Sequence, residues 1–220
     1  MDYRVIDIRN KLPRHSTKKW KKKSDIKRII VHCTAGTNQD PFLTARYHIG
    51  PNHICKTGCP AIVYTDYITR DGTIYHCNNY DDWTWHASLY NRSSVGITMA
   101  YQGLDNPPPE AQRRALMKHL VILCLYLKVL PKNVIGHREC PWMSTLLGNG
   151  SKRFIKWCPG KVVNLVQMRA ELTMRLQRRL AAEGLYKGKI DGIFGPLSRG
   201  ALYSFNPLSK QNLDNRICSD

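Results

Sequence analysis

The sequence lacks a long hydrophobic run. Its longest strongly apolar stretch, residues 120–127, is far shorter than the roughly 20 residues that a membrane-spanning helix needs. No transmembrane helix is therefore expected. Residues 1–4 also lack the basic and then apolar layout of a secretory signal peptide. We therefore expect a protein that is made in the cytoplasm or is exported by another route.

Acidic residues are scarce, with 16 Asp and Glu against 34 Lys and Arg, which gives a net charge of +18 over 220 residues. The imbalance lies at the two ends, because residues 1–30 and 151–220 are strongly basic while residues 31–150 are nearly neutral. Clustered positive charge attracts any polyanion without reading its sequence. The ends are predicted to bind nucleic acid, anionic lipid or another polyanion, or to form solvated arms. The 42% hydrophobic content is enough to bury a core, which excludes wholesale disorder.

A regular cysteine framework is also missing. The eight cysteines are spaced irregularly along a long chain, so reduced thiols are expected. Cys124 lies in an apolar helical stretch and is predicted to fill the core. Cys55 and Cys59, with His53 nearby, are predicted to form either a small metal site or a disulfide, and the sequence leaves both alternatives open.

Strand and helix patterns are mixed along the central part of the chain. The apolar run 29–31 ends at His32 and reads as a buried strand, while Asp40 followed by proline is typical of a helix start. A glycine at position 72 marks a hairpin. The patterns predict strands at 29–32, 61–69, 73–77, 94–101 and 134–136, and helices at 41–48 and 110–130. They indicate an α/β domain with a mixed sheet.

The composition changes near residue 168. A basic amphipathic helix is predicted over residues 168–183, followed by a glycine-rich loop and a short helix that starts at Pro196. This unit of about forty residues is too small to bury a large core alone, so it is interpreted as an accessory module. Residues 207–220 form a polar tail.

Three residues are candidate zinc ligands: His32 at the end of a predicted strand, His137 directly after another, and Cys158 in the segment Lys-Trp-Cys-Pro-Gly at 156–160. A hydrolytic zinc site commonly takes three protein ligands and leaves a fourth position open for water. Considered singly, each of these residues is at least as often structural, because a strand-end histidine is commonly just hydrogen-bonded and a cysteine commonly packs in the core.

Six short motifs occur in a fixed order between residues 26 and 165. They are Ile-Val-His-Cys-Thr-Ala at 30–35, Tyr64 seven residues before Asp-Gly-Thr at 71–73, Trp-His-Ala at 85–87, Ser-Val-Gly-Ile at 94–97, Gly-His-Arg-Glu at 136–139 and Lys-Trp-Cys-Pro-Gly at 156–160. In this series the sequence resembles the type 2 N-acetylmuramoyl-L-alanine amidases, a family that includes phage amidase endolysins and peptidoglycan recognition proteins. The resemblance implies their fold, a central mixed sheet flanked by helices.

The resemblance also implies which residues hold zinc. The family's ligands match His32, His137 and Cys158. Twenty residues separate the last two, so Cys140 is a rival third ligand. Cys158 is preferred because only it has a lysine two residues before it and Pro-Gly after it. Residues 47–60 form a longer and more cysteine-rich segment than in the shortest members, which either shapes the groove or holds a second metal.

Three further positions match residues of the family's active site. Tyr64 is implied to lie near the zinc-bound water, Lys156 to stabilise the oxyanion, and His86 to line the substrate groove. The implied reaction is zinc-dependent cleavage of the amide between the lactyl group of N-acetylmuramic acid and L-alanine. The alternatives are a non-catalytic peptidoglycan-recognition module and a polyanion-binding protein with structural zinc.

The C-terminal unit resembles the small three-helix peptidoglycan-binding domain, most specifically at Asp-Gly-Ile-Phe-Gly-Pro, residues 191–196. The resulting expectation is a basic arm at 1–25, a zinc amidase domain at 26–167, a peptidoglycan-binding module at 168–206 and a tail at 207–220. The expected partners are peptidoglycan and, through the basic ends, anionic wall polymers or outer-membrane phosphates, with no specific nucleic acid. We expect a monomeric phage or prophage endolysin, made in the cytoplasm of the infected or producing bacterium and acting on the wall after holin-type release.

Overall fold

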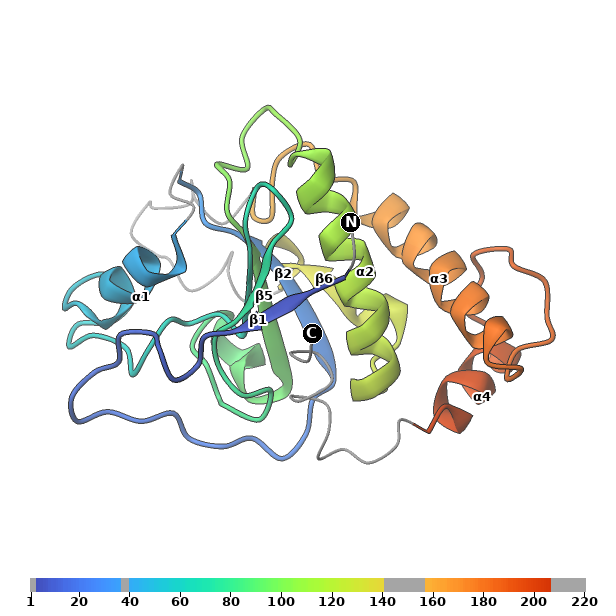
Figure 1. Cartoon of the computed structure of the whole chain (residues 1–220), viewed down its shortest axis with the longest axis horizontal. Helices are drawn as coiled ribbons and strands as arrows, with labels where there is room; N and C mark the ends of the chain where they lie inside the picture. The colour runs from blue at the N-terminus through green and yellow to red at the C-terminus, as the bar shows by residue number, and fades with distance from the viewer. Residues whose placement is uncertain (1–2, 37–39, 141–156, 207–220) are drawn as a thin grey trace.

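A six-stranded mixed sheet forms the centre of the molecule in a computed structural model that describes residues 3–36, 40–140 and 157–206 (Figure 1). The strand order is β1-β4-β3-β5-β2-β6, and every neighbouring pair is parallel except β3 with β4. The strands are β1 (Val5–Asp7), β2 (Arg28–Cys33), β3 (Asp66–Ile68), β4 (Ile74–His76), β5 (Ser94–Met99) and β6 (Val134–Gly136). The predicted fold class, a mixed sheet flanked by helices, is confirmed.

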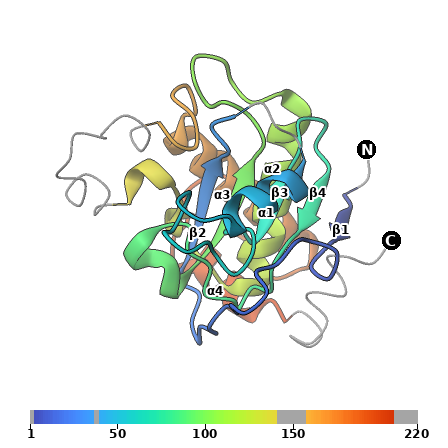
Figure 2. The ribbon, with the colours of Figure 1, turned by 90° about the vertical axis from the view of Figure 1, so that its left-hand side faces the viewer.

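Helices cover both faces of this sheet (Figures 1 and 2). On one side lies α1 (Pro41–Ile49), and on the other lies α2 (Glu110–Leu127) with α3 (Leu165–Ala182) packed against it. The predicted cap of α1 is present, because the Asp40 carboxylate accepts a hydrogen bond from the Phe42 amide at 2.7 Å. The other helices are the short turns η1 (Ser88–Ser93), η2 (Pro131–Asn133) and η3 (His137–Glu139) and the C-terminal α4 (Pro196–Ser204). No helix in these described ranges is long and apolar enough to span a bilayer.

The alternation of side chains along the central strand β2 determines which face of the sheet carries His32. Ile29 and Val31 pack into the main core under α2, whereas Ile30 belongs to a separate apolar cluster. Since successive side chains of a strand point to opposite faces, His32 lies on the face away from α2. Cys124 on α2 is fully buried in the main core, as expected from the sequence.

The segment expected as a basic arm packs closely on the domain over its described residues. It supplies the edge strand β1, which pairs with β4. The indole of Trp20 is buried and donates a hydrogen bond to the Asn78 side chain at 2.9 Å. Lys23 is also buried, and its ammonium donates to the backbone carbonyls of Asp82 and Ser94, each at 2.7 Å. These contacts fasten the segment beside strand β5.

The C-terminal unit shares the core of the central sheet. Its helix α3 begins at Leu165, so the expected boundary at residue 167 falls inside this helix. Leu172 and Leu202 are fully buried in the same core as the sheet. Lys128, at the end of α2, donates to the carbonyls of Leu202 and Phe205. The described residues of the expected three-helix module contain two helices, α3 and α4.

Candidate metal centre and substrate cleft

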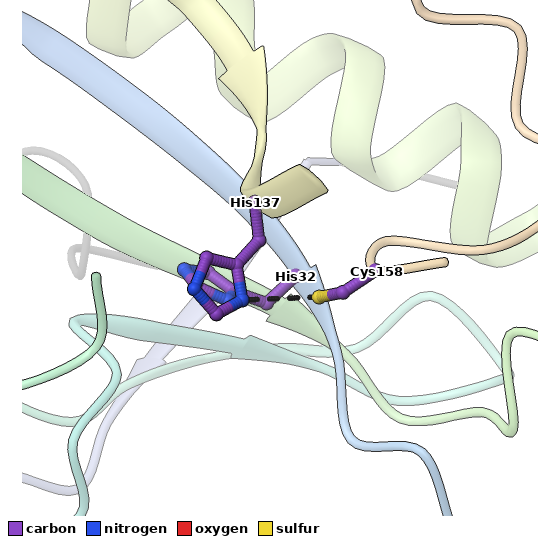
Figure 3. Close-up of side chains that lie close together, drawn as sticks. All are labelled: His32, His137 and Cys158. Atoms are coloured by element: carbon purple, nitrogen blue, oxygen red, sulfur yellow. Dashed lines mark hydrogen bonds between the residues drawn. The ribbon is translucent and has the colours of Figure 1, made fainter. Parts of the chain in front are cut away.

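His32, His137 and Cys158 converge on one point (Figure 3). One ligand atom from each residue lies within 4.8 Å of the others, and Cys158 Sγ is 3.7 Å from His32 Nδ1. The pairing of β2 with β6 explains the two histidines, because Val31 lies opposite Gly136 and each is followed directly by a histidine. The two histidines are 105 residues apart in the sequence and thus meet at the ends of neighbouring parallel strands. Cys158, which is 126 residues after His32, reaches the same point from a turn.

The protonation of these residues suits a cation. Burial lowers the pKa of His32 well below its usual range and lowers that of His137 to about 4, so both rings are neutral near pH 7. His137 Nε2 is buried and has no hydrogen-bond partner among the described residues. Burial raises the pKa of the Cys158 thiol, an effect that a bound cation would oppose. An unsatisfied nitrogen beside a buried thiol is unfavourable without a ligand, so these residues fit a metal ion. Two imidazoles and one thiolate form a donor set typical of zinc.

His86 holds the first of these histidines. His86 Nδ1 lies 3.0 Å from His32 Nε2, and His86 Nε2 lies 3.3 Å from Ser94 Oγ. Ser94 Oγ in turn donates to the Tyr90 carbonyl at 2.6 Å. The Ser94 proton is therefore directed away from His86, which makes His86 Nε2 a donor and His86 Nδ1 an acceptor. The network thereby favours a proton on His32 Nε2 and a free lone pair on Nδ1, the atom that faces Cys158.

The loop that carries Cys158 is anchored by the residue after His137. The Arg138 guanidinium donates to the carbonyls of Gly160 and Val163, each at 2.5 Å, and its amide donates to the Cys158 carbonyl at 2.9 Å. Gly160 has a φ of +150°, and a Cβ there would lie 2.0 Å from the Tyr101 hydroxyl. The Gly-His-Arg and Cys-Pro-Gly motifs thus position each other.

A cleft of about 920 Å³ opens above the three candidate ligands. Its walls are largely apolar and aromatic, and they include Trp85 and Trp157, which are 39% and 40% exposed. Tyr64 also lines the cleft, with its ring centroid 5.2 Å from that of His32. Burial raises the pKa of Tyr64 far above its usual range, so its hydroxyl keeps its proton and can donate a hydrogen bond.

The remaining predicted residues fall in different places. His86 is buried against His32 and forms part of the cleft floor. Cys140, the rival ligand, packs in an apolar cluster with Ile30 and Ala87. Lys156 lies outside the described residues.

Sequence reasoning missed two residues that support the centre. Ser94 is the hydrogen-bond partner of His86 described above. Gly96, on β5, leaves space for the His86 ring, because a Cβ at this position would lie 2.7 Å from it. Both belong to the Ser-Val-Gly-Ile motif, but the contact with His86 depends on how the loop before β5 folds back, which the motif does not reveal.

Comparisons with known proteins agree with this geometry. The sequence profile of the Amidase_2 family, described as N-acetylmuramoyl-L-alanine amidase, matches residues 22–161. No curated protein sequence matches the chain. Solved structures with the same fold include the amidase LysC from Clostridium intestinale URNW, which has a TM-score of 0.61 and 18% identity over 77% of this chain and 97% of that chain.

Two other solved structures extend the range of proteins with this fold. The Ph2119 endolysin from the Thermus scotoductus MAT2119 bacteriophage has a TM-score of 0.57 and 19% identity over 76% of this chain and 98% of that chain. The Drosophila peptidoglycan recognition protein SD has a TM-score of 0.58 and 14% identity over 76% of this chain and 94% of that chain. At these identities the structural similarities concern the fold alone.

Proposed function

The chain belongs to the N-acetylmuramoyl-L-alanine amidase family, and on this basis we propose that it is a zinc-dependent peptidoglycan hydrolase. The bond cleaved is the amide between the lactyl group of N-acetylmuramic acid and L-alanine of the stem peptide. The observation that carries the proposal is the meeting of His32, His137 and Cys158 at the base of an aromatic cleft.

These three residues would hold the zinc ion, His32 through Nδ1 and Cys158 through Sγ. A zinc ion bound to three protein ligands lowers the pKa of its water to roughly 7 and polarises a carbonyl oxygen. His86 keeps the His32 ring in the orientation and tautomer that this role needs, since its Nδ1 accepts from His32 Nε2 at 3.0 Å.

The residues around the centre bind and orient the substrate. The Tyr64 hydroxyl, which keeps its proton, is proposed to donate a hydrogen bond to the oxygen of the reacting amide. Lys156 is proposed to stabilise the negative charge that develops on the same oxygen, a role in which the loss of one donor typically costs ~10² to 10³ in rate. Trp85 and Trp157 offer flat apolar surfaces for the sugar and the stem peptide, and they exclude water.

The two alternatives fit the site less well. A non-catalytic recognition module needs no ligand set, yet here two neutral imidazoles and a cysteine face one another. A structural zinc site is typically closed by four protein ligands. Among the described residues the group that could hold a metal has three members and opens into a cleft.

The test is to digest purified peptidoglycan and identify the new termini by mass spectrometry. We expect free muramic lactyl carboxylates and free L-alanine amines, both lost in Cys158→Ser and on treatment with a chelator, and both restored by zinc in the unaltered protein. Cys124→Ser, which removes a buried thiol of α2 that does not line the cleft, serves as the matched control and should retain activity. New reducing ends in the glycan would contradict the amidase assignment.

We also propose that the protein is a monomeric phage or prophage endolysin that reaches the wall from the cytoplasm after holin-type release. The phage endolysin among the proteins of similar fold supports this origin. Expression in a bacterial host should then lyse the cells only when a holin is co-expressed. Lysis without a holin would contradict this route.

We further propose that the C-terminal unit binds peptidoglycan. The apolar side chains of Ile193 and Leu197 are 70% and 73% exposed on it and offer a contact surface. Replacing both by serine should weaken sedimentation of the protein with insoluble peptidoglycan.

A further inference from the structure

A second pair of cysteines lies near the cleft but apart from the candidate metal centre. Cys55 Sγ and Cys59 Sγ are 3.2 Å apart, about 1 Å farther than two bonded sulfur atoms. Cys59 is fully buried, whereas Cys55 is partly exposed. Both contact a small apolar cluster that includes Trp20 and Val63.

The backbone brings these two thiols together. The Gly58 amide donates to the Cys55 carbonyl at 3.1 Å, which closes a turn, and the Cys59 amide donates to the His48 carbonyl at 2.9 Å. Gly58 has a φ of +76°, and a Cβ there would lie 2.0 Å from the Ile49 carbonyl oxygen. Only glycine fits this position, so the close approach of the two sulfur atoms is built into the turn.

A metal site at this position is not supported by its surroundings. The His53 ring stacks on Tyr47 with centroids 3.9 Å apart. Within the described ranges, the group of three metal-binding side chains that comes together is the one around His32, and neither Cys55 nor Cys59 belongs to it.

The turn that carries Cys55 and Cys59 joins the cleft wall to the N-terminal part of the chain. Ile54, next to Cys55, is 45% exposed and lines the cleft. On the other side of the turn, the Lys18 ammonium donates to the carbonyls of Thr57 and Gly58 at 2.5 and 2.6 Å. A covalent bond inside this turn would therefore restrain a wall of the cleft.

We propose that Cys55 and Cys59 form a disulfide when the protein meets a small-molecule disulfide oxidant, and that this bond fixes the cleft wall carrying Ile54. The Cys55 thiolate attacks one sulfur of the oxidant and releases its other half as a thiol. The Cys59 thiolate then attacks the Cys55 sulfur and releases the second half. Two protein thiols and one disulfide thus become one protein disulfide and two small thiols.

The roles of the two thiols follow from their exposure. Cys55 is accessible and is the attacking group. Burial raises the pKa of Cys59 and disfavours its attack on an external disulfide, so Cys59 reacts second and resolves the mixed disulfide inside the turn. Such a pair stays reduced in a reducing compartment and closes in an oxidising one. The proposal requires neither zinc nor substrate, so it goes beyond the hydrolytic function.

The experiment equilibrates the zinc-treated full chain with oxidised or reduced glutathione, then alkylates the free thiols in denaturant and maps the peptides by mass spectrometry. We expect a single cross-link between Cys55 and Cys59 in the oxidised sample. Closing this short loop should raise Tm by about 4–8 °C over the reduced protein. Cys55→Ser and Cys59→Ser should lose both effects, and Cys124→Ser should keep them.

Hydrogen exchange then tests the effect on the cleft wall, because the amides of residues 50–59 should exchange more slowly in the oxidised protein. Both thiols remaining free in oxidised glutathione, or a cross-link to another cysteine, would overturn the disulfide. Zinc that prevents oxidation of the pair and also protects it from alkylation in the native protein, before denaturant is added, would identify a metal site instead. Unchanged exchange over residues 50–59 would overturn the proposed restraint. None of these readouts depends on peptidoglycan cleavage, so a failure here is distinguishable from a failure of the amidase proposal.

Discussion

Replacing His86 by alanine measures how strongly this residue holds the proposed zinc ligand His32. The substitution removes the acceptor 3.0 Å from His32 Nε2 and leaves a buried N–H without a partner. A lost hydrogen bond and an unsatisfied buried donor cost about 1–3 kcal/mol. Since 1.4 kcal/mol corresponds to a factor of ten, we expect zinc binding to weaken by roughly 10–100-fold, the range typical of partners of metal-ligating histidines.

The assay is zinc competition against a chromophoric chelator near neutral pH, which reads affinity without any turnover. His86→Asn provides a graded control, because its side-chain oxygen can accept the His32 proton and should restore most of the affinity. His53→Ala removes an exposed histidine that stacks on Tyr47 and should leave zinc binding unchanged. Thermal unfolding of each variant shows whether the fold is retained.

Zinc affinity of His86→Ala within twofold of the unaltered protein would refute the positioning role. If hydrolysis were lost at the same time, His86 would act on the substrate directly, as the sequence resemblance implies. An equal loss of zinc affinity in His86→Ala and His86→Asn would show that the hydrogen bond to His32 is not the cause.

Three further predictions rest on other parts of the molecule. Gly96→Ala places a Cβ 2.7 Å from the His86 ring and should weaken zinc binding in the same chelator assay, whereas Gly200→Ala, which meets nothing within 4 Å, should not. Burial lowers the pKa of His48 to about 4, so between pH 6.5 and 4 the unfolded chain takes up a proton that the folded protein does not. The free energy of unfolding should fall by up to about 3 kcal/mol over that window, and denaturant titrations of His48→Asn should show a flatter profile. Lysis of whole cells should weaken steeply with added salt while hydrolysis of a small soluble substrate does not, and equal salt sensitivity of both would contradict adhesion through the basic ends.

The strands and helices of the central domain follow closely from local sequence. The apolar run at 29–31 predicts a buried strand, and Asp40 before proline predicts the start of α1, and both are present. The reason is that strand burial and helix capping depend on a few neighbouring residues. The mixed topology also follows, since the hairpin around Gly72 adds an antiparallel pair to an otherwise parallel sheet.

The candidate site depended more on family motifs than on local patterns. The meeting of His32 and His137 requires β2 to pair with β6, a contact between distant segments that no local periodicity encodes. Spacing alone did not decide between Cys140 and Cys158, whereas the structure places Cys158 beside His32. The sequence also did not predict that His86 contacts His32. This contact depends on how the His86 ring is oriented and joins two residues that are 54 positions apart in the sequence.

The docking of the N-terminal segment changes how the net charge of +18 acts. Lys22 pairs with Asp81 and Asp82 at 2.7 Å. The Lys23 ammonium donates its hydrogen bonds to backbone carbonyls beside β5. These charges are partly neutralised or buried, so they add little to long-range attraction. Nine exposed cations in the described parts of the two basic ends form no ion pair: Arg4, Lys11, Arg14, Lys19, Lys21, Arg178, Lys187, Lys189 and Arg199. Within the described residues, adhesion to anionic polymers should therefore depend on these nine side chains, while Lys22 and Lys23 hold the N-terminal segment in place.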